Sequence, residues 1–247
     1  MNTFSAKKKV FMKKSVVILG ISLLSIVLNA ANIFLAGDST CASYPANRAP
    51  LTGWGQVLQQ FCKDDCKVYN FARSGASSRS FIEKKRWDEL IAKVQKGDFV
   101  IVQFGHNDSK KNNDRFAAPG AAYDANLKKF IADVRAKGAY PIIATSIARA
   151  NFKKGKIAPG NLNAYRAACF NVGKAENVPV VDLLVETSNL FNKLGPEETY
   201  KLFMCTSGIE KKKDDRTHVK KNGAEAIAKL FAESVKKQNL PVAECFK

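Results

Sequence analysis

Four short polar clusters in the sequence contain the residue types of a site built around an activated serine. They are Gly37–Thr40, Asn70–Gly75, Gly105–Asp108 and Asp215–His218. A serine hydroxyl is a poor nucleophile at neutral pH, so it needs a base within hydrogen-bonding distance and a third group that orients the base. Ser39 is the candidate nucleophile, and the chain contains only two histidines as candidate bases, His106 and His218.

His218 is the predicted base because an acidic residue lies at a suitable spacing. Positions i and i+3 of a turn share a side, so the Asp215 carboxylate can accept a hydrogen bond from Nδ1–H of His218. Asp214 is the alternative acid, and the spacing favours Asp215. His106 is the rival base, and we interpret it as a structural histidine. Taken alone, Asp215 and His218 would equally suit an exposed capping pair at a helix entry.

Attack on a carbonyl carbon places negative charge on its oxygen, and hydrogen-bond donors must meet that charge. Each such donor is worth roughly 3–4 kcal/mol of barrier. The predicted donors are the backbone N–H groups of Ser39 and Gly75 and the side-chain amide of Asn107. Asn107 also begins the only Asn-x-Ser/Thr sequence in the chain, and a role at the oxyanion requires it to be unglycosylated. As alternatives, Asp-Ser after a strand commonly caps a helix, and Gly-His-Asn-Asp suits a tight turn.

Five continuously apolar runs precede or surround these clusters, and they indicate buried parallel strands. The runs are Ile33–Ala36, Val68–Phe71, Phe99–Phe104, Ile142–Thr145 and Val178–Leu183. Between them lie apolar stripes with helical spacing, around Trp87–Val94, Leu127–Val134 and Ala224–Val235, and a surface loop is expected over 151–161. The alternation predicts one α/β domain, a three-layer α/β/α sandwich with a five-stranded parallel sheet. Sites in such sheets lie at the carboxyl ends of the strands, where the polar clusters fall.

The first thirty residues have the layout of a secretory signal. A basic run over 7–14 precedes an apolar stretch over 15–28, and Ala30 and Ala31 are small. The apolar stretch is shorter than the roughly 20 residues that a bilayer needs, and an uncleaved signal anchor is the alternative. We therefore expect a signal peptide over 1–30, a hydrolase domain over 31–247, secretion, and no stable membrane association after cleavage.

The composition describes a basic globular chain of 247 residues with a net charge of +18. Removing residues 1–30 takes away five lysines and no acidic residue, which leaves +13. A basic secreted domain suits an anionic partner such as acidic polysaccharide, although the dispersed lysines equally suit solubility. A nucleic-acid partner is not expected, because no recognised binding motif is present.

Six cysteines allow fifteen disulfide pairings, and the sequence does not choose among them. A small bridge between Cys62 and Cys66 is plausible, and a bridge between Cys205 and Cys245 would fasten the C-terminal tail. The spacing of cysteines and histidines does not suit zinc. The chain also lacks a Gly-x-Ser-x-Gly elbow, a phosphate-binding loop and a Rossmann glycine fingerprint.

Taken together, the clusters resemble those of the GDSL, or SGNH, hydrolases, most closely the rhamnogalacturonan acetylesterase branch. The most specific segments are 35–40, 53–55, 70–81, 103–108 and 217–218, and the resemblance runs from about Ile33 to about Phe231. It departs from the branch at Ala76, where Arg or Lys is frequent, and at Arg216, where Gly or Asp is common. These departures leave the triad intact and bear on the sugar specificity.

The resemblance implies a flavodoxin-like sheet and an esterase that removes acetyl groups from acetylated acidic plant polysaccharide, pectic rhamnogalacturonan above all. We expect a monomer. Its catalytic residues would be Ser39, Asp215 and His218, with Ser39, Gly75 and Asn107 at the oxyanion and no metal or cofactor. Arg79 and Trp54 are possible sugar contacts, with core packing the favoured alternative for Trp54. The competing functions are an acetylxylan or broad acyl esterase, a lipase, and a non-catalytic binder of acidic polymer.

Overall fold

The computed structural model describes residues 31–205 and 214–247, so the predicted signal peptide lies outside the described residues. A five-stranded parallel sheet with the strand order β2-β1-β3-β4-β7 forms its centre. The strands are β1 (Ile33–Gly37), β2 (Val68–Asn70), β3 (Phe99–Gln103), β4 (Tyr140–Ala144) and β7 (Val180–Val181). Every residue of the central strands β1 and β3 is buried, as their mainly apolar sequences predict.

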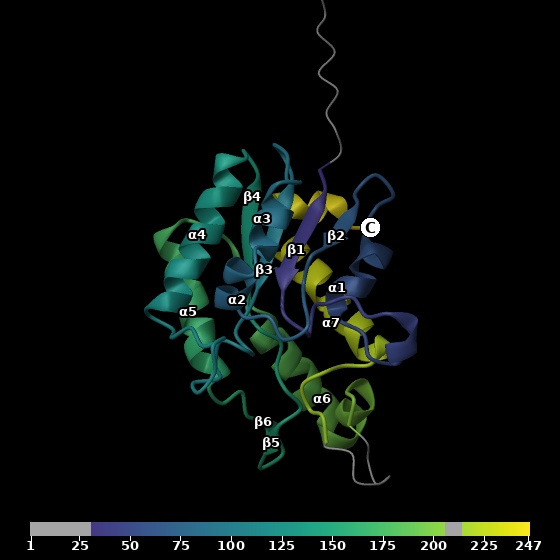
Figure 1. Ribbon diagram of the computed structural model, residues 1–247. Coiled ribbons are helices and arrows are strands. Elements are labelled where there is room, and N and C mark those ends of the chain that lie inside the picture. Colours follow the sequence, from purple (N-terminus) through teal and green to yellow (C-terminus); the bar gives the residue numbers. More distant parts are fainter. Residues whose placement is uncertain (1–30, 206–213) are drawn as a thin grey trace, which may run out of the picture.

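Helices cover both faces of the sheet, which gives three layers (Figure 1). Side chains alternate between the faces along a strand, so Ile33 and Leu35 belong to one core cluster while Phe34 and Ala36 belong to the other. The helices packed on the first cluster are α1 (Trp54–Val57), α6 (Leu183–Leu202) and α7 (Lys221–Lys237). Those on the second are α2 (Ser78–Glu83), α3 (Arg86–Ile91), α4 (Ala122–Ala136) and α5 (Leu162–Ala175).

The observed architecture confirms the predicted α/β sandwich with its five parallel strands. Two differences from the predicted elements have local reasons. The last strand is shorter than predicted, because Asp182 already caps α6 by accepting a hydrogen bond from Val185 N at 3.4 Å. The expected loop over 151–161 contains a small antiparallel hairpin, β5 (Phe152–Lys153) with β6 (Lys156–Ile157).

Three short 3₁₀ helices complete the described secondary structure: Ala46–Arg48, Leu58–Phe61 and Pro241–Cys245. Within residues 31–205 and 214–247, no helix combines the length and the apolar content needed to cross a bilayer.

All six cysteines are buried as free thiols, and the predicted bridge between Cys205 and Cys245 is wrong. The two residues lie at opposite ends of the sheet. The Cys205 thiol donates to the backbone carbonyl of Asp215 at 3.4 Å, beyond the carboxyl end of β1, whereas the Cys245 thiol donates to the carbonyl of Ala31 at 3.7 Å, just before β1 begins.

Cys62 and Cys66 are neighbours, as their spacing suggested, but they are also free thiols in the structure. Hydrogen bonding to Cys66 lowers the pKa of the Cys62 thiol. Among the described residues, no group of three His, Cys, Asp or Glu side chains is arranged to hold a metal ion.

Candidate active site

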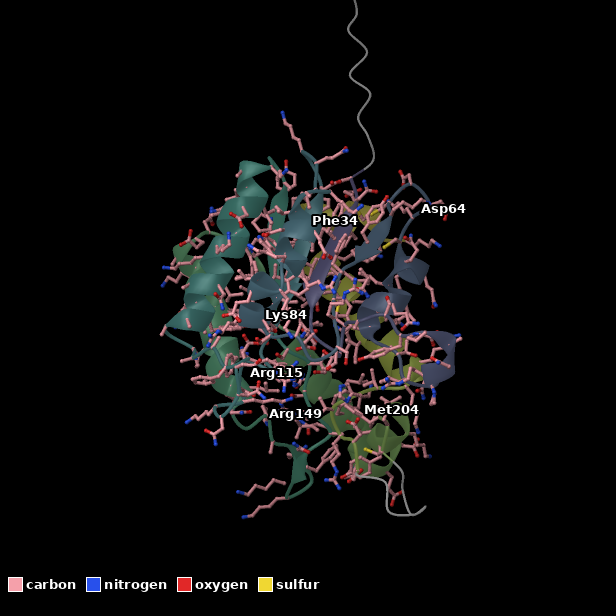
Figure 2. All side chains as sticks on the ribbon, in the orientation of Figure 1. Phe34, Asp64, Lys84, Arg115, Arg149 and Met204 are labelled. Atoms are coloured by element: carbon pink, nitrogen blue, oxygen red, sulfur yellow. The ribbon has the colours of Figure 1, made fainter. Side chains whose placement is uncertain are left out.

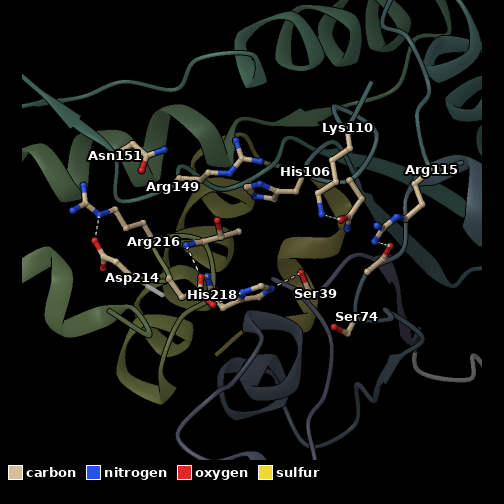
Figure 3. A pocket seen from close by; sticks show the side chains of 14 residues that line it. Ser39, Ser74, His106, Lys110, Arg115, Arg149, Asn151, Asp214, Arg216 and His218 are labelled. Atoms are coloured by element: carbon tan, nitrogen blue, oxygen red, sulfur yellow. Dashed lines mark hydrogen bonds and ion pairs between the residues drawn. The ribbon is translucent and has the colours of Figure 1, made fainter. Parts of the chain in front are cut away.

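The structure joins Ser39, His218 and Asp215 by two hydrogen bonds at the carboxyl end of the sheet (Figure 3). Ser39 follows β1, and the segment with Asp215 and His218 leads into α7. His218 Nε2 lies 2.8 Å from Ser39 Oγ, and His218 Nδ1 lies 2.8 Å from Asp215 Oδ2. A carboxylate only accepts, so Nδ1 donates to Asp215 and Nε2 of the neutral ring is left to accept the serine proton.

Asp215, and not Asp214, is the residue that orients the histidine. Its second oxygen Oδ1 accepts the backbone N–H groups of Thr217 and His218, each at 3.0 Å. Burial raises the pKa of Asp215, but the bonds from the His218 ring and from these two N–H groups outweigh it and lower the pKa to about 2. Asp214 instead pairs with Arg216, Oδ2 to Nε at 2.6 Å.

A buried polar network fixes the turn that carries Ser39. Asp38 is fully buried and accepts hydrogen bonds from the backbone N–H and hydroxyl of Thr40 at 2.9 and 2.8 Å. Gln103, at the end of β3, donates to the other Asp38 oxygen at 3.2 Å and accepts from Trp54 Nε1 at 2.9 Å. Burial raises the pKa of Asp38, and the bonds from Thr40 and Gln103 oppose that shift. This network ties β1 to its neighbour β3 directly beneath the serine.

The predicted oxyanion donors line the same cavity as Ser39. Gly75 has a φ of +78° in a turn closed by Ala76 N donating to Arg73 O at 3.1 Å, a conformation that favours glycine. Within the described chain, the backbone N–H groups of Ser39 and Gly75 donate to no protein acceptor. Both are therefore available to a bound carbonyl oxygen.

The Asn107 amide is held in place from both ends. Nδ2 donates to the Ala76 carbonyl at 2.8 Å, and Oδ1 accepts from Lys110 Nζ at 2.8 Å. An amide nitrogen carries two hydrogens, so one remains for a ligand. Asn107 is only 3% exposed, which suits the predicted position in the cleft.

The Asp108 side chain stabilises the turn that carries Asn107, a role that the sequence did not reveal. It accepts the backbone N–H of Gly105 at 3.0 Å and the backbone N–H of Ser78 at 2.9 Å. Burial raises the pKa of Asp108 to about 7 in spite of the bonds from Ser78. The carboxylate thereby joins the entry of α2 to the end of β3.

His106 lines the cavity but forms no hydrogen bond with Ser39 or with a described acidic residue. Its side chain is buried, and neither ring nitrogen has a hydrogen-bond partner among the residues described. Burial, followed by the positive charge of Arg149, lowers the pKa of His106 well below its ordinary value. The ring is therefore neutral, and His218 is the histidine placed to act on Ser39.

Trp54 and Arg79, the two residues predicted as possible sugar contacts, do not line the cavity that contains Ser39. Trp54 is fully buried and stacks on Phe231 with ring centroids 5.3 Å apart, so the interpretation as a sugar contact is wrong and core packing is correct. Arg79 pairs with Glu83 on α2, Nε to Oε1 at 2.7 Å, and is not among the residues that line the cavity.

The cavity has a volume of about 510 Å³, and its lining includes four cations, of which the sequence singled out only Arg216. They are Lys110, Arg115, Arg149 and Arg216. Arg115 and Arg149 (labelled in Figure 2) both line this cavity, although 33 residues separate them in the chain. Their separate positions along the chain gave no signal that they line one cavity.

Comparison with known proteins gives the class to which this site belongs. Residues 33–231 match the family described as GDSL-like Lipase/Acylhydrolase, so the chain is a member of this family and a carboxylic ester hydrolase. It is 36% identical over 221 residues to the rhamnogalacturonan acetylesterase RhgT of Bacillus subtilis, covering 86% of this chain and 92% of RhgT. It is also 36% identical to the probable rhamnogalacturonan acetylesterase YesY of the same organism, covering 87% and 97% of the two chains.

Solved structures agree with the fold. The crystal structure of YxiM from Bacillus subtilis superimposes with a TM-score of 0.75 and 28% identity, over 85% of this chain and 57% of that one. The acetylxylan esterase Axe2 from Geobacillus stearothermophilus matches with a TM-score of 0.61 and 19% identity, over 84% of this chain and 96% of Axe2. At that identity the likeness to Axe2 concerns the fold alone.

Proposed function

We propose that this protein removes acetyl groups from rhamnogalacturonan, a pectic polysaccharide, through an acetyl-enzyme on Ser39. The observation that carries the proposal is the pair of 2.8 Å hydrogen bonds that joins Ser39 to His218 and His218 to Asp215 inside an open cavity. The two relatives that are 36% identical, RhgT and the probable acetylesterase YesY, support the choice of substrate.

In the first half of the reaction, Ser39 Oγ attacks the acetyl carbonyl carbon while its proton passes to Nε2 of His218. The N–H groups of Ser39 and Gly75 and the amide of Asn107 stabilise the oxyanion. The bond from the acetyl carbon to the sugar oxygen then breaks, and that oxygen takes the proton from His218. Asp215 stabilises the imidazolium that exists between these proton transfers.

In the second half, water attacks the acetyl group on Ser39. His218 accepts a proton from the water and returns it to Ser39 Oγ as the acyl bond breaks, which releases acetate. The steps use only groups of this chain and water, and the enzyme returns to its starting state.

The test measures acetate released from acetylated rhamnogalacturonan, acetylated xylan and a small acyl ester. Wild type should release acetate fastest from rhamnogalacturonan, and Ser39→Ala should release almost none while it unfolds at the same temperature. Ser188→Ala on α6, outside the cavity, is the matched control and should behave as wild type. Equal release by wild type and Ser39→Ala would refute the nucleophile, and a clear preference for xylan would refute the substrate.

We also propose that residues 1–30 direct export, so that the enzyme meets its polymer outside the cell. The basic run followed by an apolar stretch supports this proposal. N-terminal sequencing of the protein from the culture medium should find a start near residue 31. Recovery of the intact chain from the membrane fraction alone would contradict export by a cleaved signal.

A further inference from the structure

Lys110 and Arg149 line the cavity, and neither pairs with an acidic side chain among the residues that the structure describes. Arg216 pairs with Asp214 at 2.6 Å, and Arg115 lies 3.8 Å from Asp114. In contrast, neither Lys110 nor Arg149 forms an ion pair within residues 31–205 and 214–247. The cavity wall that they form therefore carries two cations that no described acidic side chain pairs with directly, since Asp38 acts on them only at a distance and Asp214 and Asp215 bind Arg216 and His218.

The contacts of these two side chains are to neutral amides. Lys110 Nζ donates to Asn107 Oδ1 at 2.8 Å, and Arg149 Nη1 donates to Asn161 Oδ1 at a distance of 3.5 Å. Lys110 has three ammonium hydrogens and Arg149 has five guanidinium hydrogens, so most of their donors remain available.

Burial lowers the pKa of Lys110, and the charges of Arg115 and Arg149 lower it further. Burial also lowers the pKa of Arg149. Lys110 is exposed and Arg149 is half-buried, and the charge of the buried Asp38 opposes part of the lowering for both. A bound anion would add a closer favourable partner for these two cations.

The sheet places this wall on one particular side of the serine. Ser39 follows β1, Lys110 lies in the segment after β3, and Arg149 lies in the segment after β4, and these strands are consecutive neighbours in the sheet. Figure 3 shows Arg149, His106 and Lys110 along one side of the cavity, across from His218 and Ser39. Because the His106 ring is neutral, the charge of this wall comes from Lys110 and Arg149.

We propose that Lys110 and Arg149 form a carboxylate-binding subsite beside Ser39, which selects acetyl esters carried on or next to a uronic acid over those on neutral sugars. The cavity volume of about 510 Å³ lies in the range of roughly 300–1,000 Å³ that is typical of ligand sites. The guanidinium group binds a carboxylate with two parallel hydrogen bonds, and the ammonium group adds a point charge. This inference rests on the proposed function and gives it a chemical basis for substrate choice.

The test uses hydrolysis of a neutral small acyl ester, so that it does not depend on activity toward any polymer. Galacturonate should inhibit the wild-type reaction competitively, and galactose at the same concentration should not. Arg149→Gln should raise the inhibition constant of galacturonate about 10–100-fold, as expected for the loss of charged hydrogen bonds, while its rate on the neutral ester stays within about 3-fold of wild type. Lys110→Gln should also raise the inhibition constant of galacturonate, but it should slow the neutral ester as well, because Lys110 Nζ holds the Asn107 amide at 2.8 Å. Arg86→Gln removes the same charge from a surface pair on α3 and should change neither value.

A second measurement uses acetylated rhamnogalacturonan with its carboxyl groups intact or reduced to alcohols. Wild type should show a KM at least about 10-fold lower on the acidic polymer, and Arg149→Gln should lose that preference mainly through KM. The subsite is refuted if galacturonate and galactose inhibit equally, if inorganic phosphate inhibits as well as galacturonate, or if Arg149→Gln slows the neutral ester as much as the acidic polymer. Inhibition by galacturonate without activity on either polymer would refute the proposed function and leave the subsite supported.

Discussion

The two histidines of this chain line one cavity, and their surroundings give them opposite chemical characters. His218 lies between a carboxylate and a serine hydroxyl, with a 2.8 Å contact on each ring nitrogen. His106 lies in the opposite wall with no partner for either nitrogen among the described residues, and burial lowers its pKa. A histidine therefore does not act as a base merely because it lines the cleft. It also needs an acidic residue that orients its ring and a proton donor within hydrogen-bonding distance.

The largest expected effect comes from removing the base or its nucleophile. His218→Gln or Ser39→Ala should each lower kcat for acetate release by about 10⁴-fold or more, because the two residues act as one unit. Steady-state rates on acetylated substrate check the expectation, and the double variant should be hardly slower than either single variant. Additive losses in the double variant would show that the two residues do not work together.

The orienting carboxylate should have the next largest effect. Asp215→Asn should lower kcat by up to about 10⁴-fold, because the amide can hold the wrong tautomer of His218. Asp214→Asn is the matched control, since Asp214 binds Arg216 and not the histidine, and it should stay within about 10-fold of wild type. A larger loss for Asp214→Asn than for Asp215→Asn would reverse the assignment.

Loss of one oxyanion donor should be milder. Asn107→Ala should lower kcat by about 10²–10³-fold with little change in KM, since the donor matters most once charge develops. Michaelis–Menten analysis on the small acyl ester measures this split. If KM rises and kcat is unchanged, Asn107 serves substrate binding and not the oxyanion.

His106 should show the smallest effect on activity and a distinct effect on stability. Its folded-state pKa lies below the ordinary 6.5, so below pH 6.5 the unfolded chain binds a proton that the folded chain excludes. The wild type should therefore lose stability as pH falls below 6.5, by up to about 1.4 kcal/mol per pH unit for this group. Urea unfolding at several pH values should show a shallower slope for His106→Leu. An unchanged slope in that variant would show that the buried ring is not the group responsible.

Much of the fold could be predicted because its signals are local. The strands β1 and β3 are buried on both faces, so their residues are apolar up to Gln103, the last residue of β3. The triad was also predictable, because Ser39 lies just after the apolar run of β1 and Asp215 lies three positions before His218.

The rest depends on contacts between segments that are distant in the sequence. The bond from Gln103 to Asp38 joins residues 65 positions apart, and it exists only because β1 and β3 are neighbours in the sheet. Lys110 and Arg149 share a wall for the same reason, since β4 follows β3 in the strand order. The wrong pairing of Cys205 with Cys245 has this cause too, because spacing along the chain does not say at which end of the sheet a thiol lies.

The most direct test of the central claim, that His218 and not His106 activates Ser39, is the rate at which an alkyl fluorophosphonate modifies the protein. Peptide mass spectrometry should place the modification on Ser39 in the wild type. The rate should fall by about 10³-fold or more in His218→Gln and stay within about 10-fold of wild type in His106→Gln. Modification of a different residue, or equal rates in wild type and His218→Gln, would contradict the account.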